Sequence, residues 1–115
     1  MTPNKQTVEK YMEGFRAGNH EKILSCLTDD VVWELPGQYK HVGKAAFDKE
    51  IENENFEGKP IIQVFSYIEE NDIVVAEGAV QCKMKNRPVL NIAFCDVFQM
   101  ENTKIKKLTS YLMTK

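Results

Sequence analysis

The sequence predicts an α+β domain in which three N-terminal helices pack on one face of a curved, mainly antiparallel sheet. Three observations predict this class: helical spacing of apolar residues in the first half, long runs rich in β-branched and aromatic residues in the second half, and short polar segments between those runs. A chain of 115 residues is long enough for one hydrophobic core. We therefore expect residues 1–115 to form a single domain.

Apolar side chains at helical spacing predict the three helices. Val8, Tyr11 and Phe15 fall on one face of the first helix, and Phe47 lies on the apolar side of the third. Asn19 can cap the second, because its side chain accepts a hydrogen bond from a backbone N–H. The expected helices run from about Asn4 to Ala17, from Asn19 to near Asp29 and Asp30, and from after Gly43 until the polar segment 52–60.

The strands follow from β-branched and aromatic runs. "VVWEL", residues 31–35, is a short β run that ends at Pro36 and Gly37. Four long strands are expected over residues 61–70, 72–85, 87–100 and 104–113. Their short polar connections are typical of antiparallel neighbours, so these four strands should form a meander.

Several of these strands are apolar on both faces. In the strand 72–85, one face carries Val74, Ala76, Val80 and Cys82, and the other carries Ile73, Val75 and Ala79. In an antiparallel sheet with one solvent-exposed face, apolar and polar residues should alternate more regularly along each strand. We therefore expect the outer sheet face to be covered by a second copy of the chain in a homodimer.

The charged residues of the chain indicate which classes of partner it is not suited to bind. The chain has 15 basic and 17 acidic residues, with the basic residues scattered between acidic ones, which argues against nucleic acid or an anionic membrane surface as a partner. No apolar run approaches membrane-spanning length, and the N-terminus lacks the pattern of a secretory signal, so the cytoplasm is the expected location. The three cysteines are far apart, which indicates core thiols and neither a metal site nor disulfides.

One acidic residue breaks the apolar pattern of the strand 87–100. Asp96 shares a strand face with Phe94 and Phe98, where a carboxylate is costly unless it is hydrogen-bonded, paired or protonated. A two-residue turn at residues 86–87 would place Glu77 opposite Asp96. Such a pair would raise the pKa of one acid toward neutrality, as general acid–base catalysis requires. The alternative is that Asp96 bonds to backbone and Glu77 lies on a wet face.

Other polar residues lie near the expected core. The ring of Tyr11 is expected in the core, with its hydroxyl directed to a pocket or an acid. His41, in the loop before the third helix, is either at a pocket mouth or solvated. Trp33 is expected to anchor the helices on the sheet, and Glu34 alternates to the other face as a rim residue.

A family resemblance rests on three segments: "VEKYMEGFRAGNHEKILSCLTDDVVWELPG", "HVGKAAF" and "FCDVFQMENTKIKKLTSYL". Together they resemble the SnoaL-like branch of the nuclear transport factor 2-like superfamily, which includes polyketide cyclases and ketosteroid isomerases. The resemblance implies a cone-shaped, cystatin-like α+β fold with a deep apolar pocket between helices and sheet, and often a dimer. It implies no cofactor and no metal.

The resemblance also implies site residues. The helix-one tyrosine and the strand carboxylic acid of ketosteroid isomerase fall on Tyr11 and Asp96, and a carboxylic acid kept neutral beside a tyrosine is the established feature of that enzyme. The general base of the isomerases falls on Leu35, with Glu34 one residue earlier and on the other face. The pocket implied by the resemblance is lined by Phe15, Trp33, Glu34, Leu35, Tyr39, Phe47, Phe94, Phe98, Thr109 and Tyr111.

Two functions are consistent with these residues. The first is a cofactor-free isomerase or cyclase that uses Asp96, Tyr11, Glu77 and His41 on an apolar small molecule. The second is a small-ligand-binding or dimerisation domain without chemistry.

Overall fold

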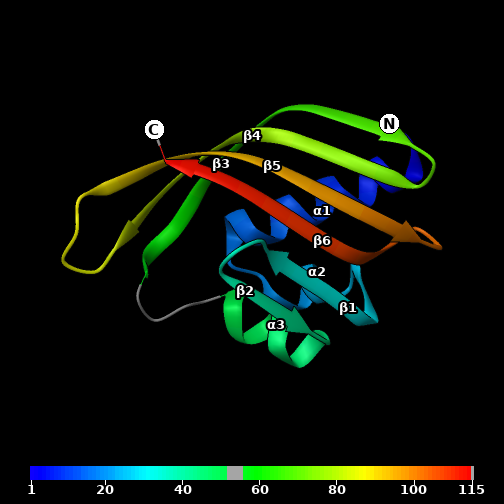
Figure 1. Ribbon diagram of the computed structural model, residues 1–115, viewed down its shortest axis with the longest axis horizontal. Helices are drawn as coiled ribbons and strands as arrows, with labels where there is room; N and C mark the ends of the chain where they lie inside the picture. Colours follow the sequence, from blue (N-terminus) through cyan, green and yellow to red (C-terminus); the bar gives the residue numbers. More distant parts are fainter. Residues whose placement is uncertain (52–55, 115) are drawn as a thin grey trace.

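The computed structural model describes residues 1–51 and 56–114 and has the predicted α+β class. Three helices lie on one side of a curved sheet of six strands (Figure 1). The strand order is β2-β1-β6-β5-β4-β3, and the last four strands along the chain form the predicted antiparallel meander. Only β1 and β6 pair in parallel among the described strands.

The first helix closely follows its prediction, whereas the second is shorter. α1 spans Pro3–Ala17, and Gly18 ends it in the left-handed conformation at φ 64°. Asn19 caps α2 (His20–Leu24) as expected, with its side chain accepting from the Lys22 N–H. The extension of this helix to Asp29 and Asp30 was wrong, because Leu27 already pairs with β6. Tertiary strand pairing here outweighs local helix preference.

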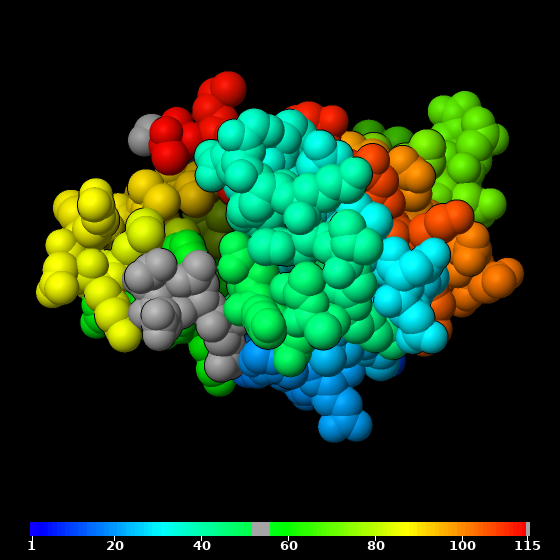
Figure 2. All heavy atoms as spheres, turned by 60° about the horizontal axis from the view of Figure 1, so that its bottom comes forward, coloured from blue at the N-terminus to red at the C-terminus, as the bar shows by residue number. Residues whose placement is uncertain are grey.

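The remaining elements show where the sequence-based bounds fail. α3 spans Lys44–Ile51, as predicted; residues 52–55 of the polar segment that follows lie outside the described residues. The strands are β1 Leu27–Leu35, β2 Tyr39–Val42, β3 Phe56–Glu70, β4 Ile73–Met84, β5 Val89–Glu101 and β6 Lys104–Thr114. Residues 39–42 were predicted as a loop but form β2, in which His41 lies opposite Trp33 of β1. Figure 2 shows β2 and α3 side by side on the surface, with the β4–β5 hairpin (yellow) at one end of the molecule.

The register of β4 on β5 corrects one site prediction. Ala76 lies opposite Asp96, and Glu77 lies opposite Cys95. Glu77 is exposed on the outer sheet face, whereas Asp96 is buried on the inner face. The last β4–β5 pair is Lys83 with Val89, so the connection is longer than the two-residue turn assumed, and the register shifts by one residue. The predicted Glu77–Asp96 acid pair does not form.

The core fills half of the inner sheet face, which we call the closed half. There, helix side chains such as Val8 and Phe47 pack on Val74, Phe98 and Leu108, all of them fully buried. The other half of the same face, toward the β4–β5 connection, carries Val80, Cys82, Ile92, Phe94 and Leu112, and we call it the open half.

Apolar side chains are also exposed outside the core. Ile68 and Tyr111 on the outer sheet face are 61% and 53% exposed, and Met113 is 73% exposed. Half-buried Val75 on β4 lies opposite half-buried Val97 on β5 on the same face. No helix in the described ranges is long and apolar enough to cross a membrane.

Candidate active site

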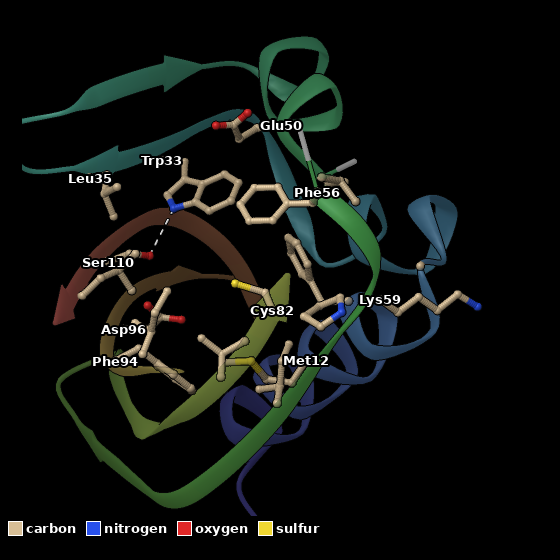
Figure 3. A pocket seen from close by; sticks show the side chains of 18 of the residues that line it. Met12, Trp33, Leu35, Glu50, Phe56, Lys59, Cys82, Phe94, Asp96 and Ser110 are labelled. Atoms are coloured by element: carbon tan, nitrogen blue, oxygen red, sulfur yellow. Dashed lines mark hydrogen bonds between the residues drawn. The ribbon is translucent and has the colours of Figure 1, made fainter. Parts of the chain in front are cut away.

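A cavity of about 430 Å³ occupies the open half of the inner face. Its walls come from α1, β1, β2, α3 and the strands β3 to β6 (Figure 3). Most of the lining is apolar or aromatic, which is typical of small-molecule sites. The sequence-predicted residues that line it are Tyr11, Phe15, Trp33, Leu35, Tyr39, Phe94 and Asp96.

Asp96 lies where the closed half meets the open half. Its strand neighbours on the inner face are Phe98, fully buried in the core, and Phe94 on the cavity wall. Asp96 is 9% exposed, and its Oδ1 is one of two buried side-chain polar atoms without a hydrogen-bond partner among the described residues. Burial raises the pKa of Asp96 to about 7, because the charged form loses its hydration. Near neutral pH the group is therefore present in both its acidic and its basic form.

Ser110 and Trp33 support this carboxyl group. The Trp33 indole N–H donates to Ser110 Oγ over 3.1 Å (Figure 3). Ser110 lies opposite Asp96 on β6, and its hydrogen bond to the carboxylate partly opposes the rise in the pKa of Asp96. Since the indole N–H occupies the Ser110 oxygen, the hydroxyl proton is free to point at Asp96.

Two tyrosines also contribute polar groups to the cavity. Tyr11 packs against the rings of Phe15 and Phe98, and its pKa is raised by burial and by the negative charge of Asp96. Burial, together with the charges of Glu50 and Asp96, raises the pKa of Tyr39 to about 12. Both phenols therefore keep their protons at neutral pH and are hydrogen-bond donors.

Several predicted site residues lie elsewhere. Phe47 and Phe98 are fully buried in the core, and His41 packs on the rings of Tyr39 and Trp33 beside the cavity without being part of its lining. The Glu34 carboxylate lies 3.6 Å from Lys107 Nζ, away from the cavity. Thr109, Tyr111 and Glu77 lie on the outer face, because strand side chains alternate.

Sequence reasoning also missed cavity residues. Ser110 looked like an ordinary polar strand residue, although its spacing from Leu108 put it on the inner face. Glu50 reaches the cavity because α3 runs beside β1 and β2, which helical periodicity alone does not show. Cys82 was assigned to an apolar strand face, and the cavity shares that face with the core.

The described residues hold no cluster of three or more His, Cys, Asp or Glu side chains that could bind a metal ion. The cavity wall carries the carboxyl group of Asp96 and the phenol groups of Tyr11 and Tyr39.

The curved sheet, the helices on its inner face and the cavity between them define a protein of the nuclear transport factor 2-like fold class. The sequence profile of the SnoaL-like domain matches residues 8–108, so the chain belongs to this family, as its resemblance predicted. A search of curated protein sequences found no match.

Solved structures agree on the fold. The chain is similar to an LEH-like epoxide hydrolase of M. tuberculosis, with a TM-score of 0.85, 14% identity and coverage of 96% of this chain and 83% of that one. It is similar to an NTF2-like protein of unknown function from Burkholderia pseudomallei, with a TM-score of 0.86, 18% identity and coverage of 98% and 92%. It is also similar to TerC co-crystallised with polyporic acid, with a TM-score of 0.85, 22% identity and coverage of 99% and 92%.

Proposed function

We propose that the protein is a cofactor-free isomerase or cyclase that transfers a proton next to a carbonyl group of an apolar small molecule. The observation that carries this proposal is Asp96: a carboxyl group with an unpartnered oxygen, buried at the wall of an apolar cavity, with a pKa of about 7. An acid that titrates near the working pH is suited to general acid–base catalysis.

Asp96 and Tyr11 have separate roles in this reaction. Protonated Asp96 donates a hydrogen bond to the carbonyl oxygen of the ligand, and Tyr11 is a second donor to the same region. Donors aimed at a developing enolate contribute about 3–4 kcal/mol to transition-state stability. Phe15, Trp33 and Phe94 supply aromatic surface for the ligand. Among the compared proteins, TerC was crystallised with a small organic acid, polyporic acid, which supports a small-molecule role for this fold.

The test uses two probes and the single tryptophan. Trp33 lines the cavity, so 2-naphthol entering it should change the intrinsic fluorescence. Isomerisation of cyclohex-3-en-1-one to its conjugated isomer is followed by ultraviolet absorbance. We expect Asp96→Asn to lower this rate by about 100-fold or more. Asp29→Asn, at a fully exposed aspartate, is the matched control and should leave the rate unchanged.

A non-catalytic ligand-binding domain is the second candidate. It is favoured by Leu35, an apolar cavity residue at the position where the isomerases carry their base. This function predicts that 2-naphthol binds while no isomerisation above the buffer rate occurs in native protein or in either variant.

We also propose that the outer sheet face forms a homodimer. The exposed Ile68 and Tyr111 and the half-buried Val75 and Val97 give this face an apolar surface that a second copy would cover. Ile68→Glu should convert a dimer into a monomer in sedimentation velocity. A native protein that sediments as a monomer at micromolar concentration contradicts this proposal.

The cytoplasm is the proposed location of the protein. Cys26, Cys82 and Cys95 are all free thiols, which suits a reducing compartment. Recovery of the native protein in an oxidising compartment would contradict this proposal.

A further inference from the structure

A proton transfer next to a carbonyl needs a base as well as the donor Asp96, and the usual position for that base is Leu35. Glu34, the neighbouring acid, is directed to Lys107 and away from the cavity. We infer that Glu50, at the end of α3, is the base that takes the proton from the carbon next to the carbonyl. This inference rests on the proposed function and names the residue that completes it.

Glu50 lines the same cavity as Asp96, and its side chain is 22% exposed. Figure 3 shows Glu50 on the α3 side of the Trp33 ring and Asp96 on the sheet. Tyr39 lies within reach of both charges, since Glu50 and Asp96 each raise its pKa. The two acids therefore share one cavity, so a ligand held by Asp96 has a second carboxyl group in the wall around it.

The other titratable groups of the cavity are less suited to accept a proton. Glu57 is exposed and bound to Lys83 over 2.8 Å, and this ion pair lowers the pKa of Glu57 and its basicity. Lys59 directs its side chain away from the cavity (Figure 3). Burial raises the pKa of Cys82, so its thiol keeps its proton. Tyr11 and Tyr39 are protonated donors, as described above.

His41 lies where it can position Glu50. Its Nε2 is 3.8 Å from Glu50 Oε1, and it is the other buried polar atom without a hydrogen-bond partner in the described ranges. The imidazole is held by its ring contact with Tyr39, whose centroid is 4.4 Å away. A small approach of the two groups would form a hydrogen bond that orients the carboxylate. His41 is therefore a positioning residue.

The step balances without any co-reactant. The C–H bond next to the carbonyl breaks, its proton passes to a Glu50 carboxylate oxygen, and its electron pair forms the enolate double bond. Asp96 holds the enolate oxygen through its proton. For an isomerisation, the Glu50 carboxyl then returns the proton to the far end of the conjugated system, and both acids regain their starting states.

The test compares Glu50→Gln with Glu34→Gln, a matched change at a glutamate outside the cavity. Both variants are assayed with cyclohex-3-en-1-one for isomerisation and with 2-naphthol for binding by Trp33 fluorescence. We expect Glu50→Gln to slow isomerisation by about 100-fold or more while the Kd for 2-naphthol changes by less than about threefold. Because Glu34 lies outside the cavity, Glu34→Gln should isomerise the ketone at a rate within about twofold of the native rate. Glu50→Asp, which keeps the carboxylate at a shorter reach, should fall between native and Glu50→Gln.

The outcomes separate the two proposals. A native enzyme that isomerises the ketone and keeps its rate in Glu50→Gln overturns the role of Glu50 and leaves the proposed function intact. Native protein that binds 2-naphthol without isomerising the ketone overturns the role of Glu50 and favours the ligand-binding alternative. Native protein that binds neither probe overturns both. Thermal unfolding of Glu50→Gln near the native midpoint shows that a lost rate is not a lost fold.

The role of His41 has a separate readout. His41→Asn should reduce kcat with little change in KM, because the Glu50 carboxylate loses the side chain that orients it. A variant with the native kcat would overturn the positioning role.

Discussion

The closed and open halves of the inner sheet face differ although the same strands form both. On β5, Phe98 is fully buried among helix side chains, whereas Phe94, four residues earlier, lines the cavity. The helices cover only part of the sheet, so the strands run on past the packed core. In this molecule, the length of the strands beyond the helices creates the cavity, and the side chain at the boundary, Asp96, is buried without being fully paired.

The largest expected difference between the halves is in packing. Phe98→Ala should lower the free energy of unfolding by about 3–5 kcal/mol, because it leaves a void in a close-packed core. Phe94→Ala merely enlarges an existing cavity and should cost about half as much or less. Urea unfolding of the two variants measures both. Equal costs would show that the open half is packed as tightly as the closed half.

Asp96→Asn tests the boundary between the halves through pH. The pKa of Asp96 is about 7 in the folded protein and about 4 in the unfolded chain, so the unfolded chain releases its proton first as pH rises. The stability contributed by the neutral group is complete below pH 4, falls between pH 4 and 7, and levels off above that range. The loss approaches about 4 kcal/mol, at about 1.4 kcal/mol per pKa unit.

Urea unfolding of native protein and Asp96→Asn at pH 4 and pH 8 isolates this contribution. Relative to native protein, the variant should gain stability at the higher pH. A difference in stability between the two proteins that does not change with pH would contradict the burial of a carboxyl group with an unpartnered oxygen.

Gly78 tests how closely the backbone packs in the open half. A Cβ added there would lie 2.0 Å from the Gln63 carbonyl oxygen and 2.9 Å from Phe94 Cζ. Gly78→Ala should therefore cost about 1–3 kcal/mol, since the β3 backbone must move. Ala79→Gly, at the next position on the outer face, is a control for backbone entropy and should cost about 1 kcal/mol or less. Thermal unfolding measures the loss of stability in both variants. Equal losses would show that the β3 backbone moves aside at no cost in stability.

The smallest effect is expected at the support of the carboxyl group. Trp33→Phe removes the indole donor to Ser110 and should cost about 1 kcal/mol in urea unfolding. Without that donor, the Ser110 hydroxyl should spend less time directed at Asp96, so the pH midpoint of the Asp96 titration should rise. An unchanged midpoint, measured by carbon NMR of the carboxyl group, would contradict the connection.

The sequence predicted most of the fold because its signals are local. Helical spacing around Tyr11 and the β-branched runs after Ile61 gave the correct elements, and alternation put Asp96 inward. β2 was missed because "YKHV" is short and is held by its pairing with β1. The second helix was extended too far because the pairing of Leu27 with β6 depends on a strand almost eighty residues away.

The site was harder to predict than the fold, because it depends on register and on helix placement. One residue in the β4–β5 connection decides whether Glu77 faces Asp96, and the turn residues Asn86 and Arg87 are compatible with more than one length. Glu50 and Ser110 become visible as cavity residues only after α3 and β6 have been placed against β1. The placement of one element against another is not determined by any single segment of the sequence.

The hydrogen-bonded groups from the Trp33 indole through Ser110 to Asp96 allow the indole N–H to report the protonation state of Asp96. The indole N–H of the lone tryptophan gives one isolated proton resonance, and its chemical shift depends on the electron density at the serine oxygen. Gain or loss of the Asp96 proton changes that density. The protonation of Asp96 can thus be measured without label or ligand, in the same spectrum that reports whether the fold is intact.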